Sequence, residues 1–185
     1  MEFTAAAQDM RDKALASALN KVADQVKTAA SREVRAAGYN LKAATIKAAI
    51  KVRRASPGNL KSVVVANGKP VPLLQYAARQ TGKGVTVNVL KGRKLIAGAF
   101  IATMPSGHKG VYVRENGGKH VKVVRAGKPS WHQLPIRELF GPSIPDGLAN
   151  AAVQAALQQL ITDKFPAILA RESAWLQRKS SRTLL

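Results

Sequence analysis

The stretch Gly98–Arg114, GAFIATMPSGHKGVYVR, decides how the middle of this chain folds. It places an apolar run, a Met-Pro-Ser-Gly segment, a histidine and a second β-like run close together. Proline and glycine between two apolar runs are typical of a turn that joins two strands. Glycine, serine, histidine and lysine crowded into one loop also occur in catalytic and phosphate-binding sites. The rest of the sequence has to decide between these two interpretations.

The catalytic interpretation finds little support. Ser106 and His108 are neighbours in one turn, which rarely gives triad geometry, and no carboxylate follows within the loop. The closing Lys and Ser or Thr of a phosphate-binding loop are absent. Glu138 and Asp146 form the only close acidic pair nearby, and roles at helix termini explain them better than acid–base chemistry. We therefore expect no catalytic residues and no enzyme.

A metal or cofactor site is equally weakly indicated. His108, His120 and His132 lie twelve residues apart, with Glu115 as the only acidic neighbour. Zinc ligands usually come at tighter spacings, with carboxylates or cysteines nearby, and this chain has no cysteine. No apolar run is long enough to cross a membrane. We expect no metal, no cofactor and no membrane partner.

The charge of the chain is its most unusual property. Thirty Lys and Arg residues against ten Asp and Glu residues give a net charge of +20. The excess is concentrated in residues 61–132, which hold 13 basic residues and one acidic residue. No acidic residue occurs between Glu33 and Glu115. Such a segment attracts polyanions or acidic protein surfaces.

The N-terminal part, residues 1–50, has a helical pattern. Apolar residues recur every three or four positions, at Leu15, Leu19, Val22, Val26, Ala30 and Val34. This spacing predicts a helix over residues 4–37 that ends at Gly38, with a second helix over residues 41–50 capped by Asn40. The apolar stripe of the first helix favours packing on the sheet over a subunit interface.

The middle part, residues 51–140, has the pattern of short strands. Two apolar runs flank Pro57-Gly58-Asn59, which predicts a hairpin. The run VTVNVLKG from Val85 alternates apolar and polar residues, as a half-buried strand does. The long apolar run from Lys94 is interrupted by Gly98. A further hairpin is expected around Asn116-Gly117-Gly118.

The C-terminal part begins with the segment LPIRELFGPSIP, residues 134–145, whose three prolines predict a constrained connector. A helical pattern then runs from Asp146 to about Lys179. Pro166 lies inside it and predicts a kink or break at about residues 162–165, with Asp163 capping the segment that follows. The fold class is therefore α+β: one domain over residues 1–185, in which helices over 1–50 and 146–180 flank a small antiparallel or mixed β-sheet core over 51–140.

Several motifs in order resemble the prophage minor tail protein Z family of long-tailed bacteriophages. They are VRRASPGNLKSVVVANGKPVPLLQYAARQTGKGVTVNVLKGRK, then GAFIATMPSGHKGVYVR, then LPIRELFGPSIP. The resemblance covers residues 51–145, with helical patterns on both sides. Ala97 departs from it, because a proline is expected before Gly98.

The resemblance implies a virion protein of the tail or neck, found in the host cytoplasm during assembly, that acts in tail completion and head-to-tail joining. It implies a homo-oligomeric ring of about six copies around the DNA channel. Its neighbours would be the tail terminator and head-completion or connector proteins. The segment MPSGHKG would then be a turn that presents basic side chains, and Gly141, Pro142 and Pro145 would form a rigid assembly connector.

Basic residues in expected turns and strand ends are the candidate contact residues: Arg53, Arg54, Lys83, Lys91, Arg93, Lys94 and Lys109. They would contact either the DNA backbone without reading sequence or an acidic neighbouring protein, and both contacts are compatible with the sequence. The alternative function is a free, non-sequence-specific DNA-binding protein of nucleoid or packaging type. The scattered aromatic residues disfavour a base-stacking platform.

Overall fold

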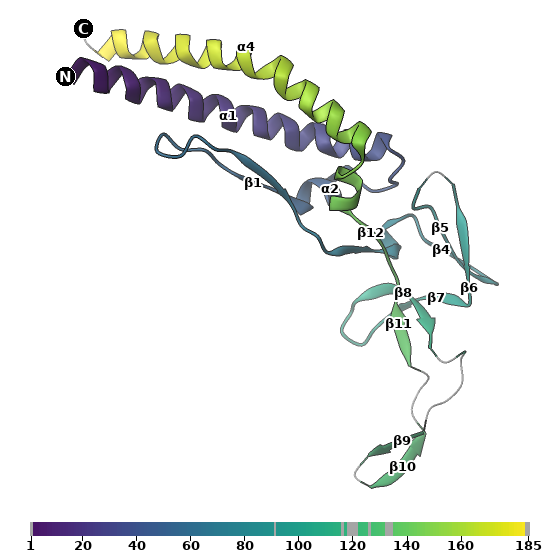
Figure 1. Cartoon of the computed structure of the whole chain (residues 1–185). Coiled ribbons are helices and arrows are strands. Elements are labelled where there is room, and N and C mark those ends of the chain that lie inside the picture. The colour runs from purple at the N-terminus through teal and green to yellow at the C-terminus, as the bar shows by residue number, and fades with distance from the viewer. Residues whose placement is uncertain are drawn as a thin grey trace. The chain divides into compact units, whose positions relative to one another are not determined.

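The computed structural model describes residues 2–90, 92–115, 117, 122–125, 127–131 and 135–183 (Figure 1). The chain divides into two compact units: unit 1 comprises Met1–Ala37, Ala43–Gly68 and Ile144–Leu185, and unit 2 comprises Gly38–Lys42 and Lys69–Ser143. The long helices belong to unit 1, and short antiparallel strands occur in both units. The α+β class is therefore confirmed, whereas a single functional domain stays a prediction.

Two long helices dominate unit 1. Helix α1, Glu2–Ala36, confirms the expected N-terminal helix, and α4, Ala151–Thr183, lies alongside it (Figure 1). The expectation that the α1 stripe packs mainly on a sheet is wrong. Its buried residues Ala18, Val22 and Val26 meet Ile168 of α4 instead. Helix α4 supplies a matching apolar stripe of Leu157, Leu160, Ile161, Phe165 and Leu169, while the sheet contributes Val64.

The expected hairpin is present in unit 1. Strands β1, Ile50–Arg53, and β2, Val63–Ala66, pair antiparallel around the turn at Ser56–Asn59. Helix α2, Ala43–Ala49, precedes β1 and is shorter than expected. Asn40 does not cap it, because α2 begins three residues later. The Asn40 backbone N–H instead donates to the Val89 carbonyl within unit 2.

The C-terminal helices break at a different place from the one expected. The short helix α3, Ile144–Leu148, carries Asp146 in its first turn, and α4 then begins after Asn150. The Asn150 side chain caps α4 by accepting a hydrogen bond from the Ala152 N–H at 3.0 Å. A break at residues 162–165 is wrong, since α4 continues through Pro166.

Packing against α1 on both sides of Pro166 explains why the helix does not break there: Phe165 and Ile168 both belong to the core shared with α1. The axis of α4 bends between its two ends (Figure 1). A bend is the usual consequence of a proline within a helix. Asp163 is not a cap but an interior residue, and its carboxylate accepts a hydrogen bond from the Gln159 side chain.

Unit 2 consists of short strands and one 3-10 turn: β3 Pro70–Pro72, η1 Leu73–Gln75, β4 Arg79–Thr81, β5 Gly84–Val87, β6 Lys94–Ala97, β7 Ala99–Thr103, β8 Lys109–Arg114, β9 Lys122–Arg125, β10 Lys128–Trp131, β11 Ile136–Glu138 and β12 Phe140–Ser143. In the part of the chain that the structure describes, they form four separate antiparallel sheets, with strand orders β4-β5-β6, β11-β8-β7, β12-β3 and β10-β9.

The opening stretch forms the hairpin β7–β8, as the turn interpretation predicts. Gly98, at a φ of +71°, separates β6 from β7, so the long apolar run becomes two strands of different sheets. The expected hairpin around Asn116–Gly118 is wrong where the structure describes its strands. Strand β8 uses both of its edges for β7 and β11, and β9 pairs with β10 instead. The residues Asn116 and Gly118 themselves lie outside the described part.

Candidate contact surfaces

Six of the seven predicted basic contact residues lie in the described part of the chain, where they are exposed but distributed over both units. Arg53 and Arg54 belong to the β1–β2 hairpin of unit 1, whereas Lys83, Arg93, Lys94 and Lys109 belong to unit 2. Lys91 lies outside the described residues. The six described residues therefore do not form one surface within either unit.

Two of these arginines already have partners inside their own unit. Arg54 donates to both carboxylate oxygens of Asp24 at 3.1 and 3.2 Å, which ties the hairpin to α1. Arg93 donates to the Ala77 carbonyl at 3.0 Å and to the Thr86 hydroxyl at 3.2 Å. Ala77 has a φ of +50°, which is unusual for a residue with a β-carbon. Arg93 thus stabilises a strained turn, a role that no local sequence pattern indicates.

The carboxylates of unit 2 are both engaged. This unit has 14 Lys and Arg residues and only two acidic residues, Glu115 and Glu138. Glu115 pairs with Arg137 at 3.4 Å, and Glu138 pairs with His108 at 2.9 Å. Among the described residues, no carboxylate pairs with the exposed cations Lys42, Arg79, Lys83, Lys94 and Lys109. Unit 2 therefore presents an uncompensated positive charge that attracts anionic partners.

The histidine of the opening stretch has a structural partner. His108 lies at the end of the turn, where its carbonyl accepts a hydrogen bond from the Met104 N–H at 2.8 Å. Its Nε2 lies 2.9 and 3.0 Å from the two Glu138 carboxylate oxygens. Glu138 is a residue of strand β11, so the expected helix-terminus role is wrong for it. The same role is confirmed for Asp146.

Strand register explains this pair. Glu138 lies opposite Tyr112 in the β11–β8 ladder, and Gly110 leaves the space that its carboxylate fills. A β-carbon on Gly110 would lie 2.6 Å from the Glu138 Oε1. Burial, followed by the negative charge of Glu138, raises the pKa of the Tyr112 hydroxyl above its usual range. The cluster fastens the β7–β8 turn to β11, and no described hydrogen bond joins Ser106 to His108. His120 and His132 lie outside the described residues.

The predicted connector is folded into both units. Gly141 and Pro142 belong to β12 of unit 2, and Pro145 belongs to α3 of unit 1. Gly141 does not have a left-handed φ, so backbone conformation is not what requires a glycine there. The reason is space: a β-carbon there would lie 2.6 Å from the Tyr76 ring. The Tyr76 hydroxyl donates to the Pro142 carbonyl at 2.7 Å, so Gly141 and Pro142 pack against the buried Tyr76 of unit 2.

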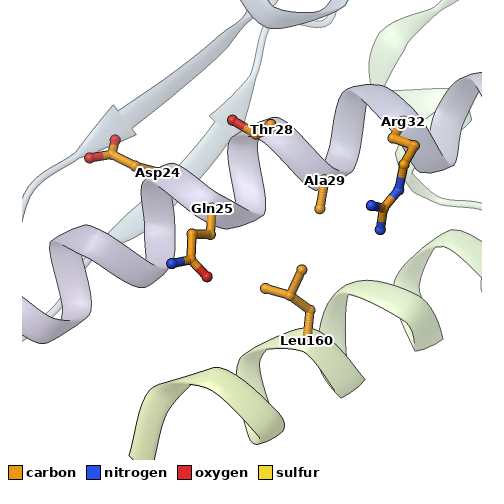
Figure 2. Close-up of a pocket in the computed structure, with 6 residues that line it drawn as sticks. All are labelled: Asp24, Gln25, Thr28, Ala29, Arg32 and Leu160. Atoms are coloured by element: carbon orange, nitrogen blue, oxygen red, sulfur yellow. The ribbon is translucent and has the colours of Figure 1, made fainter. Parts of the chain in front are cut away.

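A groove of about 440 Å³ runs along the surface where α1 and α4 meet in unit 1. Five residues of α1 and Leu160 of α4 line it, and Figure 2 shows the Leu160 side chain directed toward α1. Its lining combines two apolar side chains, Ala29 and Leu160, with four polar ones. Asp24, the carboxylate among them, already pairs with Arg54. The groove is therefore suited to contacts rather than to chemistry.

Comparison with known protein families identifies the family to which this chain belongs. The chain matches the family described as prophage minor tail protein Z (GPZ) over residues 4–173. The match extends beyond the motif region at residues 51–145 to include most of α1 and α4. The protein is a structural component of a bacteriophage tail. It belongs to the prophage minor tail protein Z family.

Two further comparisons were negative. No curated protein matches this chain. No solved structure matches it either. Among the described helices, none combines the length and apolar character that crossing a membrane requires.

Proposed function

We propose that this tail protein acts in tail completion and in joining the tail to the head, at the neck of the particle, without enzymatic activity. In this role it forms a ring of about six copies around the DNA channel, because closed rings are the usual product of identical subunits that meet head to tail. Its neighbours are the tail terminator and the head-completion or connector proteins.

The uncompensated charge of unit 2 is the observation that carries this proposal. Both of its carboxylates are engaged, so the exposed cations are available to the anionic components of a neck. DNA and acidic protein surfaces are both such components. The exposed faces of the α1–α4 pair in unit 1, including the groove in Figure 2, provide surface for contacts between copies.

Disruption of the gene in the phage that carries it tests the role. We expect assembled tails and DNA-filled heads that fail to join, and expression of the intact chain from a plasmid should restore joined particles. Electron microscopy of the lysate distinguishes unjoined heads and tails from joined particles. Joined, infectious particles without the protein would contradict the proposal. Absence of any assembled tails would assign the chain to an earlier step.

Quantitative mass spectrometry of purified particles tests the ring and separates the proposal from its alternative. A neck ring predicts a small, fixed copy number per particle. A free DNA-binding protein of nucleoid type predicts an abundant protein in cells that is missing from particles. One copy per particle would reject the ring while leaving the virion role intact.

A further inference from the structure

Strand β6 of unit 2 is an outer strand with an open edge. It pairs with β5 on one side and with no strand on the other within the described part of the chain. The Gly98 N–H donates to the Lys83 carbonyl at 3.2 Å, which continues the β5–β6 register. Since hydrogen-bonded pairs alternate along an antiparallel ladder, Ile96 bonds to β5. The backbone groups of Leu95 and Ala97 then point to the open edge.

A close approach at Gly84 agrees with this assignment. A β-carbon on Gly84 would lie 2.1 Å from the Ile96 carbonyl oxygen, as expected if that carbonyl is directed at β5. The open edge of β6 therefore offers the N–H and C=O groups of two residues to another strand. Such an edge is a template for pairing with a second chain.

Apolar side chains lie on both faces of this edge. Leu95 is 49% exposed and shares a face with Thr86 and Arg79 of the neighbouring strands. On the opposite face, Lys94 lies opposite Val87 at a pocket of about 150 Å³. Leu90, 45% exposed, also lines this pocket. An added strand would place alternate side chains over Leu95 and into the pocket.

The charge around the edge selects the partner. Arg79, Lys83 and Lys94 are exposed, and no described carboxylate pairs with them. A second copy of this chain fits poorly, because its net charge is +20 and both acidic residues of its unit 2, Glu115 and Glu138, are already paired. Nucleic-acid interfaces are more polar than protein interfaces, so half-exposed leucines beside the cations favour a protein.

We propose that the open edge of β6 binds an extended, acidic segment of a neighbouring virion protein by strand addition, with apolar side chains of that segment over Leu95 and in the pocket at Leu90. The inference rests on the proposed function, because it supplies the chemistry of one neighbour at the neck. It also assigns a contact to some of the basic residues: Lys94, Arg79 and Lys83 contact protein.

Two synthetic peptides and one DNA duplex test the proposal on the full-length protein. One peptide alternates valine and glutamate, and the other alternates valine and lysine. We expect the glutamate peptide to bind, measured by fluorescence anisotropy, and the lysine peptide not to bind. Hydrogen exchange should show new protection in the segment that contains Leu95 and Ala97. Binding without protection there, or equal binding of both peptides, would overturn the proposal.

Three variants locate the interaction. Leu95→Pro removes an N–H that faces the open edge and leaves the β5 bonds intact, so it should abolish binding, while Leu95→Ala should retain part of it. Lys94→Glu should weaken binding about tenfold. Lys109→Glu makes the same charge change on another strand and should have little effect. Melting curves confirm that each variant folds. If Leu95→Pro binds as the parent does, strand addition is wrong.

The DNA arm and a particle arm separate the two proposals. Duplex binding that Lys94→Glu weakens and Leu95→Pro does not would assign these cations to DNA and reject the edge as a protein site. In the phage, Leu95→Pro should reproduce the unjoined tails of the disrupted gene, with Leu95→Ala as control. Normal particles from Leu95→Pro, together with unjoined tails from the disrupted gene, would reject only the strand-addition proposal.

Discussion

Lys21 of α1 donates to the Glu172 carboxylate of α4 at 2.7 Å, and this contact joins the two long helices of unit 1. Ser17, one turn earlier on α1, donates to the other carboxylate oxygen at 2.8 Å. Glu172 is buried, with only 6% of its surface exposed. The hydrogen bond from Lys21 is the largest influence on this carboxyl, and it holds the pKa below the ordinary value although burial acts in the opposite direction.

The first prediction concerns pH. Because the Glu172 pKa is lower in the folded state, the unfolded chain takes up its proton first as the pH falls. The ionised Glu172 carboxylate therefore stabilises the folded state fully at a pH above 4.5, the ordinary pKa of a glutamate. This contribution is lost as the pH falls through the lowered pKa of the folded state. Glu172→Gln should lower the free energy of unfolding by about 1 kcal/mol at neutral pH, with a smaller difference in acid. Urea titrations at both pH values measure this, and a difference that grows in acid would contradict it.

The second prediction concerns Gly141. Gly141→Ala forces a β-carbon against the Tyr76 ring and should destabilise unit 2 by about 1–3 kcal/mol. Gly82→Ala is the matched control, because nothing lies within 4 Å of its added β-carbon and its φ is not left-handed. Thermal melting monitored by circular dichroism compares the two variants. Equal melting temperatures would show that Tyr76 relaxes without cost.

The third prediction concerns the attachment of the β1–β2 hairpin to α1. The Asn20 side chain donates to the Ala55 carbonyl at 3.0 Å and accepts from the Ala55 N–H at 2.8 Å. Asn20→Ala should therefore lower the free energy of unfolding by about 1–3 kcal/mol, since it leaves the N–H and the carbonyl of Ala55 without their partner. Arg54→Gln removes the exposed ion pair with Asp24 and should lower the free energy of unfolding by less than about 1 kcal/mol. Urea unfolding measures both losses. If Arg54→Gln lowered the free energy of unfolding more than Asn20→Ala, the ion pair would be the main attachment of the hairpin to α1.

The fourth prediction concerns Pro166, which is exposed within the continuous helix α4. Proline in a helix interior costs about 3 kcal/mol relative to alanine. Pro166→Ala should raise the free energy of unfolding, with Ala167→Gly as a control that lowers it. A loss of stability in Pro166→Ala would show instead that the bend of α4 is needed to keep both of its halves on α1. Chemical denaturation distinguishes the two results.

The sequence by itself determined the features that depend on neighbouring residues. The three- and four-residue spacing of apolar side chains predicted α1, because helix periodicity is local. Turn residues predicted the β1–β2 hairpin and the β7–β8 turn for the same reason. The ordered motifs between residues 51 and 145 indicated the family, which the match over residues 4–173 confirms.

Only the tertiary structure decided which segments meet. Strand β8 has two edges, and which strands fill them depends on segments far away in the chain, so local turn chemistry wrongly favoured β9. The pairing of His108 with Glu138, thirty residues later, follows from the register of β11 on β8. Helix α4 passes through Pro166 because packing on α1 outweighs a local preference to break. Long-range packing energies exceed the local preferences that a sequence pattern records, and they settled these features.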